Sequence, residues 1–213
     1  MKTNLGCWEE VLSSSPESYK KWFEEEKKIL QKTITPNSKV LDVGCGVGRG
    51  INDIISITKS ISGIDHDKKA VTDAQKKFCK YPSIKFFQEN AKNMSFAGGE
   101  FDFVICMGTF TNFASDKFVI LDEIKRVLNK DGKIIISAYS ENALNERMKV
   151  YNKLKIKINE IKKDGTVIFD ESLGDNISEQ FTKEELENIF SRTKLHIENI
   201  TKAGIGYVCI LKK

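Results

Sequence analysis

A short apolar run that ends in a glycine-rich turn constrains the fold of this chain more than any other feature. The run is Val40–Val43, and glycines follow it at positions 44, 46 and 48. The run predicts a buried strand, and the alternating glycines predict a turn whose backbone closely approaches another group. Asp42 lies just inside the end of this strand, and Asp65 closes the next apolar run, Ile61–Asp65. A glycine turn beside an acid at the tip of the neighbouring strand is how an open α/β sheet binds a nucleoside.

The rest of the chain alternates regularly between predicted helices and predicted strands. Beyond the first strand we expect helices over residues 48–58, 67–80 and 116–129, and strands over residues 61–64, 84–87, 101–107 and 133–139. Strands separated by helices of this length predict βαβ units, a parallel sheet and right-handed crossovers. Two further runs, residues 196–201 and 207–211, are joined by a glycine-containing segment and predict a hairpin.

The two ends of this alternating region carry additional predicted helices. Ser15 suits a helix cap and Pro16 a first helical position, so we expect a helix that runs to about Lys32. A longer lysine-rich helix is expected from Glu141 to about Ile158, followed by a turn at residues 163–166 and short extended pieces near 167–169 and 177–181. Thr182 and Glu185 have the spacing of a capping box.

These elements predict one domain over residues 1–213. Within it, residues 1–35 form an N-terminal helical lid and residues 142–180 an insertion over the active site. Tyr19 and Trp22 fit equally a lid and the packing face of an amphipathic helix.

Composition argues against a nucleic-acid-binding or membrane protein. The chain has 34 basic and 30 acidic residues, a net charge of +4 that is too dispersed for a phosphate-binding surface. No apolar run reaches the ~20 residues of a membrane-spanning helix, and Met1–Asn4 leads into no hydrophobic signal region. We therefore expect a cytoplasmic protein with no membrane partner. Nucleic acid is disfavoured as a partner but stays open.

The cysteines and histidines give little basis for a metal site or a disulfide framework. Only His66 and His196 are available as imidazole ligands. No cysteine pair has C-x-x-C spacing, and the five cysteines are widely separated: Cys7, Cys45, Cys79, Cys106 and Cys209. We predict reduced structural thiols and no metal.

Several segments, in order, resemble the motifs of one enzyme family. The turn has the pattern D-x-G-x-G-x-G, which resembles the first motif of the class I S-adenosylmethionine-dependent methyltransferases. Further segments at the expected spacings resemble later motifs of the same family: Glu89–Phe96, Phe101–Met107, Glu123–Lys133 and Gln180–Leu186. The resemblance implies an α/β fold, a three-layer Rossmann-like sandwich. Its mostly parallel seven-stranded sheet would carry an antiparallel C-terminal hairpin strand. It also implies a transferase that uses S-adenosylmethionine and releases S-adenosylhomocysteine.

The resemblance assigns a set of residues to the cofactor. Asp65 would accept from the ribose hydroxyls, and Asn90 stands where an Asp commonly accepts from the adenine amino group. Met107 and Gly108 would lie near the reacting sulfonium. The complete expected set is Asp42, Gly44, Cys45, Gly46, Gly48, Arg49, Asp65, His66, Asn90, Ala91, Met107 and Gly108. Two of these have a structural alternative, since Asp42 can bond loop amides and Arg49 can simply start a helix.

The sequence defines the methyl acceptor less well than the cofactor. After the fourth strand there is no Asn/Asp-Pro-Pro-Tyr/Phe tetrapeptide, and Met107–Phe113 resembles the loop of small-molecule methyltransferases. No residue of this loop is an obvious general base, so we predict no catalytic side chain. A polar acceptor pocket is expected from four residues: Tyr139, Asn142, Arg147 and Tyr151. We expect a small-molecule acceptor and a monomer or homodimer, with RNA or protein acceptors open.

Two other classes of protein share parts of this pattern. A nicotinamide-dependent oxidoreductase would want G-x-G-x-x-G, but Arg49 stands where the third glycine belongs. A non-catalytic cofactor-binding subunit of a complex would keep the cofactor motifs without turnover, and this alternative stays open.

Overall fold

A computed structural model describes residues 15–170 and 177–213. The central feature is a seven-stranded sheet in the order β3-β2-β1-β4-β5-β10-β9. Neighbouring strands are parallel except for β10, which pairs antiparallel with both β5 and β9. The strands are β1 (Val40–Val43), β2 (Ile61–Asp65), β3 (Lys85–Gln88), β4 (Phe101–Met107), β5 (Leu128–Tyr139), β9 (His196–Ala203) and β10 (Gly206–Lys212). The expected sheet and its antiparallel hairpin strand are confirmed.

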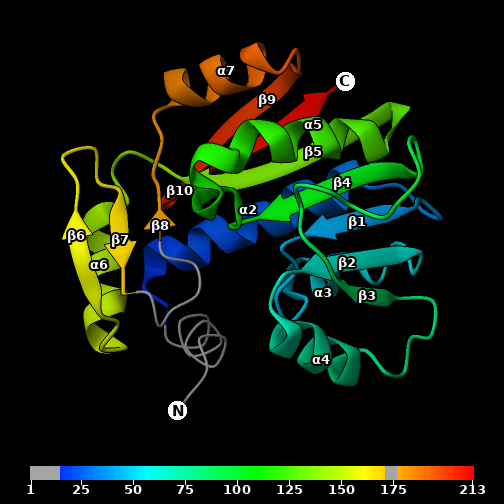
Figure 1. The fold of residues 1–213 in the computed structure, drawn as a ribbon, viewed down its shortest axis with the longest axis horizontal. Helices are drawn as coiled ribbons and strands as arrows, with labels where there is room; N and C mark the ends of the chain where they lie inside the picture. The colour runs from blue at the N-terminus through cyan, green and yellow to red at the C-terminus, as the bar shows by residue number, and fades with distance from the viewer. Residues whose placement is uncertain (1–14, 171–176) are drawn as a thin grey trace.

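Helices cover both faces of the sheet (Figure 1). One face packs against α2 (Glu17–Thr33), α3 (Arg49–Ile54) and α4 (Lys68–Lys77), and the other against α5 (Lys117–Val127) and α7 (Lys183–Arg192). Successive side chains of a strand alternate between the two cores, so Val40 packs with the first group and Leu41 with the second. Because both faces are buried, the central strands are continuous apolar runs rather than alternating ones. The three-layer sandwich is confirmed.

Local signals in the sequence explain several helix starts. Asp67 caps α4 by accepting from the Lys69 N–H, and Thr182 with Glu185 forms the expected capping box of α7. The start of α2 differs from the prediction by one residue. Pro16 is extended, with φ −55° and ψ 158°, and occupies the cap position itself, so the helix begins at Glu17.

The segment between β5 and α7 differs most from the sequence prediction. The expected helix over residues 141–158 is shorter, α6 (Leu144–Lys153). Lys155 then adopts a left-handed φ of 54°, which ends the helix, and the following residues form a strand. That strand belongs to a small antiparallel sheet: β6 (Ile158–Ile161), β7 (Val167–Phe169) and β8 (Ile177–Ser178). The small sheet and α6 lie beyond the end at which β1 and β4 finish (Figure 1).

Three smaller differences concern element boundaries. The helix predicted over residues 48–58 ends earlier, as α3 at Ile54. The fifth strand begins at Leu128 instead of residue 133, with a register shift against β4 between Phe101 and Phe103. Two short 3-10 helices, η1 (Phe110–Asn112) and η2 (Ala114–Asp116), follow β4 where a loop was expected.

No helix within residues 15–170 and 177–213 is long and apolar enough to cross a bilayer. The same residues contain no group of three or more His, Cys, Asp or Glu side chains arranged to hold a metal ion.

Candidate functional site

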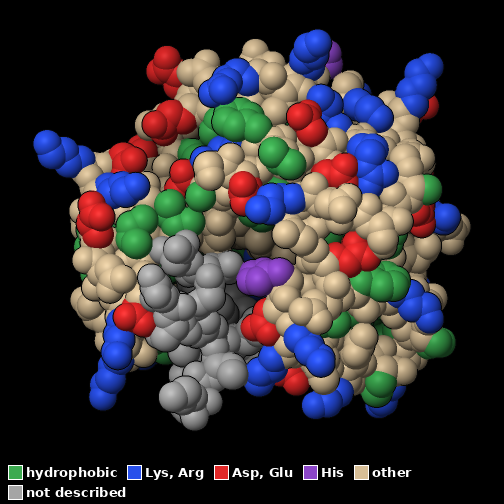
Figure 2. Space-filling model, viewed as in Figure 1, with side chains coloured by type: hydrophobic (Ala, Val, Ile, Leu, Met, Phe, Trp, Pro, Cys, Tyr) green, Lys and Arg blue, Asp and Glu red, His purple; other side chains and the backbone are tan. Residues whose placement is uncertain are grey.

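A cavity of about 750 Å³ opens where β1, β2 and β4 end. It is hollowed into the face shown in Figure 2, where basic and acidic side chains are interspersed around it. The sequence-predicted cofactor residues line this cavity, with the exception of Gly48. Ligands of open α/β sheets bind at this position, outside the carboxyl ends of the parallel strands.

The glycine turn between β1 and α3 supplies one wall of the cavity. Gly44, Gly46 and Gly48 have left-handed φ values of 70°, 52° and 81°, a conformation that residues with a Cβ adopt at a cost. A Cβ on Gly44 would overlap Thr109, whose Oγ1 donates to the Gly44 carbonyl over 2.9 Å. A Cβ on Gly48 would lie 2.5 Å from the Phe78 ring. Gly48 therefore provides room for packing instead of lining the cavity.

Asp65, at the end of β2, faces this turn. Its Oδ2 accepts from the Gly46 N–H over 2.8 Å and its Oδ1 from the Asp67 N–H over 3.0 Å. The two backbone amides orient the carboxylate, and its side chain is 12% exposed. Each oxygen keeps a lone pair for a further donor in the cavity.

The residues after Asp65 and β3 form a more open wall. The His66 side chain is 62% exposed, and its Nδ1 lies 3.6 Å from Asp65 Oδ1. Asn90 uses its Oδ1 to accept from the Lys92 N–H over 3.0 Å, so its amide oxygen already has one donor. Ala91 follows it in the lining.

Asp42 lies beneath the glycine turn and is almost wholly buried. Burial raises the pKa of its carboxyl to about 7; Arg49 opposes this shift, and the negative charges of Asp65 and Glu26 add to it. At neutral pH the carboxyl is therefore poised between its two protonation states.

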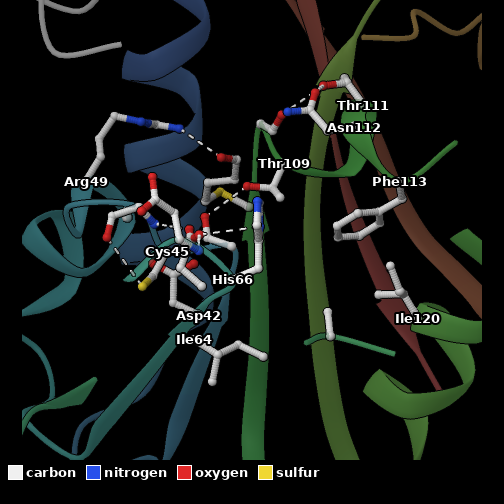
Figure 3. Close-up of a pocket in the computed structure, with 18 of the residues that line it drawn as sticks. Asp42, Cys45, Arg49, Ile64, His66, Thr109, Thr111, Asn112, Phe113 and Ile120 are labelled. Carbon is white, nitrogen blue, oxygen red and sulfur yellow. Dashed lines mark hydrogen bonds and ion pairs between the residues drawn. The ribbon is translucent and has the colours of Figure 1, made fainter. Parts of the chain in front are cut away.

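Arg49 begins α3 and extends beside α2, on the left of the cavity in Figure 3. Its guanidinium forms an ion pair with Glu26 of α2 and lies 4.4 Å above the Phe23 ring. Its Nη2 donates to the Met107 carbonyl over 3.4 Å. Burial lowers the pKa of Arg49, but the charge and hydrogen bond of Glu26 outweigh burial and raise it overall.

Comparisons with known proteins agree with this geometry. A family model described as a methyltransferase domain matches residues 41–136. An uncharacterised protein of Methanocaldococcus jannaschii is 30% identical over 154 residues, which cover 69% of this chain and 70% of that protein. The chain belongs to the class I S-adenosylmethionine-dependent methyltransferases. Because proteins of this family use S-adenosylmethionine, it is the cofactor of this protein. The alternative of a nicotinamide-dependent oxidoreductase is therefore wrong.

One further relative and one solved structure of similar fold have names that state the methyl acceptor. A demethylmenaquinone methyltransferase of Bacillus licheniformis is 27% identical over 120 residues, which cover 55% of this chain and 50% of that enzyme. The structure of 1,6-didemethyltoxoflavin-N1-methyltransferase from Burkholderia thailandensis, with S-adenosylhomocysteine bound, superimposes with a TM-score of 0.71. It is 16% identical, and the match covers 95% of this chain and 80% of that chain. The chain thus spans about half the length of the curated demethylmenaquinone methyltransferase.

Aromatic side chains line the part of the methyltransferase cavity next to α2. Tyr19, Trp22 and Phe23 contribute from α2, and Tyr139 from the end of β5. The Trp22 and Tyr139 rings lie 5.1 Å apart, and Trp22 is only 2% exposed. Tyr19 and Trp22 therefore belong to the packing face of α2, and both side chains also line the cavity. Phe113 and Ile120 face this region from the opposite side (Figure 3).

The expected polar acceptor pocket is wrong for three of its four residues. Arg147 is wholly buried, where its Nη2 donates to the Ser178 carbonyl over 2.8 Å and its Nε to Tyr151 Oη over 3.2 Å. Its N–H groups are thus engaged between α6 and the small sheet, and Arg147 is not among the residues that line the cavity. Asn142 is exposed and lies outside the lining; of the four, only Tyr139 belongs to it.

The sequence did not predict a role for Glu26, whose side chain contacts Arg49 of the cavity lining. It is wholly buried and accepts from Arg49 and from the Ser137 hydroxyl. Its position in the helix could have indicated this burial. Glu26 lies on the buried face of α2, which consists of Tyr19, Trp22, Glu26, Ile29 and Leu30. A carboxylate in the middle of an otherwise apolar stripe needs a partner inside the protein.

Proposed function

We propose that this methyltransferase transfers the methyl group of S-adenosylmethionine to a small-molecule acceptor by in-line displacement. The observation that carries the proposal is the single cavity in which Asp65, the glycine turn and the residues after β4 meet an aromatic wall. A cavity of about 750 Å³ must hold both the cofactor and the acceptor, which favours a small acceptor. The named acceptors of the relative and of the structure of similar fold, demethylmenaquinone and 1,6-didemethyltoxoflavin, support the same class.

The lining residues divide naturally between the parts of the cofactor. Asp65 would accept from the ribose hydroxyls, with its carboxylate already oriented by two backbone amides. Asn90, Ala91 and His66 would surround the adenine. Gly44, Cys45, Gly46, Arg49 and Asp42 would surround the methionine end, and Met107 and Gly108 would lie beside the sulfonium.

We further infer that α2 and the segment over residues 142–180 cover the acceptor side. Ser178 of β8 lines the cavity. Next to it, the Glu179 N–H donates to the Thr111 carbonyl over 2.8 Å, and the Glu179 carboxylate pairs with Lys117 at 2.9 Å. These contacts would hold the small sheet against the turn after β4. Residues 1–14 and 171–176 of the expected lid and insertion lie outside the described residues.

The protein's part in the reaction is positioning. When bound, the cofactor supplies a methyl group that is already activated for displacement. The aromatic wall would exclude water and align the acceptor lone pair. Burial raises the pKa of both Tyr19 and Tyr139 above its usual range, so these phenols stay neutral and orient rather than deprotonate the acceptor.

Calorimetric titration with S-adenosylhomocysteine tests the proposal first. We expect micromolar binding and no binding of NAD, because the turn lacks the third glycine of a dinucleotide site. Turnover is then measured with radiolabelled S-adenosylmethionine and a panel of small quinones, phenols, amines and heterocycles. Absence of S-adenosylhomocysteine binding by the folded protein would contradict the proposal. Binding without turnover on the small molecules, but with turnover on RNA or protein, would replace the acceptor class.

The raised pKa of Asp42 predicts a pH-dependent preference between cofactor and product. S-adenosylmethionine carries a sulfonium charge that S-adenosylhomocysteine lacks, so the ionised carboxylate favours S-adenosylmethionine. Asp42 must lose its proton to become ionised, and its pKa is about 7. The affinity for S-adenosylmethionine divided by the affinity for S-adenosylhomocysteine should therefore rise between about pH 6 and pH 8, by roughly threefold to tenfold. Calorimetry at three pH values measures this ratio. In Asp42→Asn the ratio should no longer rise with pH. An equal rise in the wild-type protein and the variant would contradict the role of the Asp42 carboxylate.

A further inference from the structure

Glu26 links α2 to two places in the cofactor cavity. One carboxylate oxygen pairs with Arg49 Nη1, and the other accepts from the Ser137 hydroxyl of β5. Ser137 Oγ in turn accepts from the Gly108 N–H over 2.7 Å, and Arg49 Nη2 donates to the Met107 carbonyl over 3.4 Å. Both branches thus end at one peptide group, the one that joins Met107 to Gly108 at the end of β4.

The ion pair between Glu26 and Arg49 is enclosed by its surroundings. Glu26 has no solvent exposure, and the Arg49 side chain is 23% exposed. Phe23 covers the guanidinium at 4.4 Å. A buried carboxylate is tolerated only when its charge and lone pairs are satisfied, and removing one partner leaves the other charge uncompensated.

Arg49 retains hydrogen-bonding capacity toward the cavity. A guanidinium has five N–H donors, and Arg49 belongs to the cavity lining. Its planar fork is suited to a carboxylate, but only when its orientation is held. The Glu26 carboxylate on one side and the Phe23 ring on another provide that orientation.

We propose that Glu26 is a positioning residue of the cofactor site. It holds the Arg49 guanidinium and the Met107–Gly108 peptide toward the amino-acid end of the cofactor. Helix α2 therefore sets the recognition of that end, in addition to packing on the sheet. The inference rests on the proposed function, because it assumes that this cavity takes S-adenosylmethionine.

Comparison of two ligands separates positioning from general structure. S-adenosylhomocysteine has the amino-acid end, whereas 5′-methylthioadenosine has the same adenosine and thioether without it. For Glu26→Gln we expect S-adenosylhomocysteine to bind about 10- to 100-fold more weakly, with 5′-methylthioadenosine changed by less than about threefold. Glu24→Gln is the matched control, since Glu24 lies on the same helix and is exposed.

Each outcome of this experiment has a definite meaning. Equal weakening of both ligands, or no change in either, overturns the positioning role of Glu26 while the proposed function stands. Failure of the wild-type protein to bind either ligand counts against the proposed function itself. If Glu26→Gln does not fold, Ser137→Ala is the variant to measure. It removes the hydroxyl that connects Glu26 to the Gly108 N–H and keeps the Glu26 charge. Selective loss of S-adenosylhomocysteine affinity in that variant supports the proposal, and unchanged affinity overturns it.

Discussion

Asp65→Ala is expected to weaken S-adenosylhomocysteine binding by at least about 100-fold, because each charge-assisted hydrogen bond contributes about 1.5–3 kcal/mol. The carboxylate would accept from both ribose hydroxyls in the proposed complex. It also holds the Gly46 and Asp67 amides at 2.8 Å and 3.0 Å. The substitution therefore removes ligand contacts and the internal partner of the glycine turn together. Calorimetry gives the affinity, and circular dichroism shows whether the fold is retained.

Asp73→Ala serves as the control for Asp65→Ala. Asp73 lies on α4, and its carboxylate pairs with Lys69 at 2.7 Å on the exposed side of the helix. This variant should bind S-adenosylhomocysteine as the wild-type protein does. Unchanged affinity in Asp65→Ala would show that the cofactor does not use the tip of β2.

Trp22→Ala is expected to lower the free energy of unfolding by about 3–5 kcal/mol, the usual cost of removing a large core side chain. The indole is 2% exposed and packs between Tyr139 and Phe23, at ring distances of 5.1 Å and 5.6 Å. A Cβ on Gly206 would overlap the indole, which shows how closely β10 approaches α2. Denaturant unfolding monitored by far-ultraviolet circular dichroism measures the loss.

The Trp22 experiment also distinguishes a core helix from a mobile lid. Lys21→Ala is the control, since Lys21 is the exposed neighbour of Trp22 on α2. It should change the free energy of unfolding by less than about 0.5 kcal/mol. If Trp22→Ala weakened cofactor binding but left the unfolding free energy at the wild-type value, α2 would be only a lid.

Local patterns were sufficient to predict most of the sheet and the glycine turn that forms one wall of the cavity. The apolar run Val40–Val43 is a buried strand, and Gly44 and Gly46 lie in the turn that their spacing predicted, with a left-handed backbone. Asp65 lies opposite the turn because consecutive parallel strands end at the same edge of a sheet. Asp67 and Thr182 cap helices within their own turn, so sequence neighbours decide both.

Features that depend on distant segments were not predictable in this way. A lysine-rich stretch was expected to stay helical to about residue 158, but the helix ends at Lys153, and residues 158–161 pair with the distant strand β7. Arg147 had the chemistry of an anion ligand, yet its donors meet carbonyl and hydroxyl groups of the small sheet and α6. Helix and strand propensities predict such segments poorly, because the energies of strand pairing and burial override them.

The sequence by itself determined the family, the strands of the main sheet with the helices between them, and the positions of the glycine turn and of the acid at the end of β2. The tertiary structure alone decided that Glu26 of α2 meets Arg49 and, 111 positions along the chain, Ser137. The physical reason is that the residues of a motif lie close together in the sequence, so their spacing alone indicates that they act together. An ion pair between α2 and α3, and a hydrogen bond from β5 to the same carboxylate, depend on how the helices pack on the sheet, and no single segment contains that information.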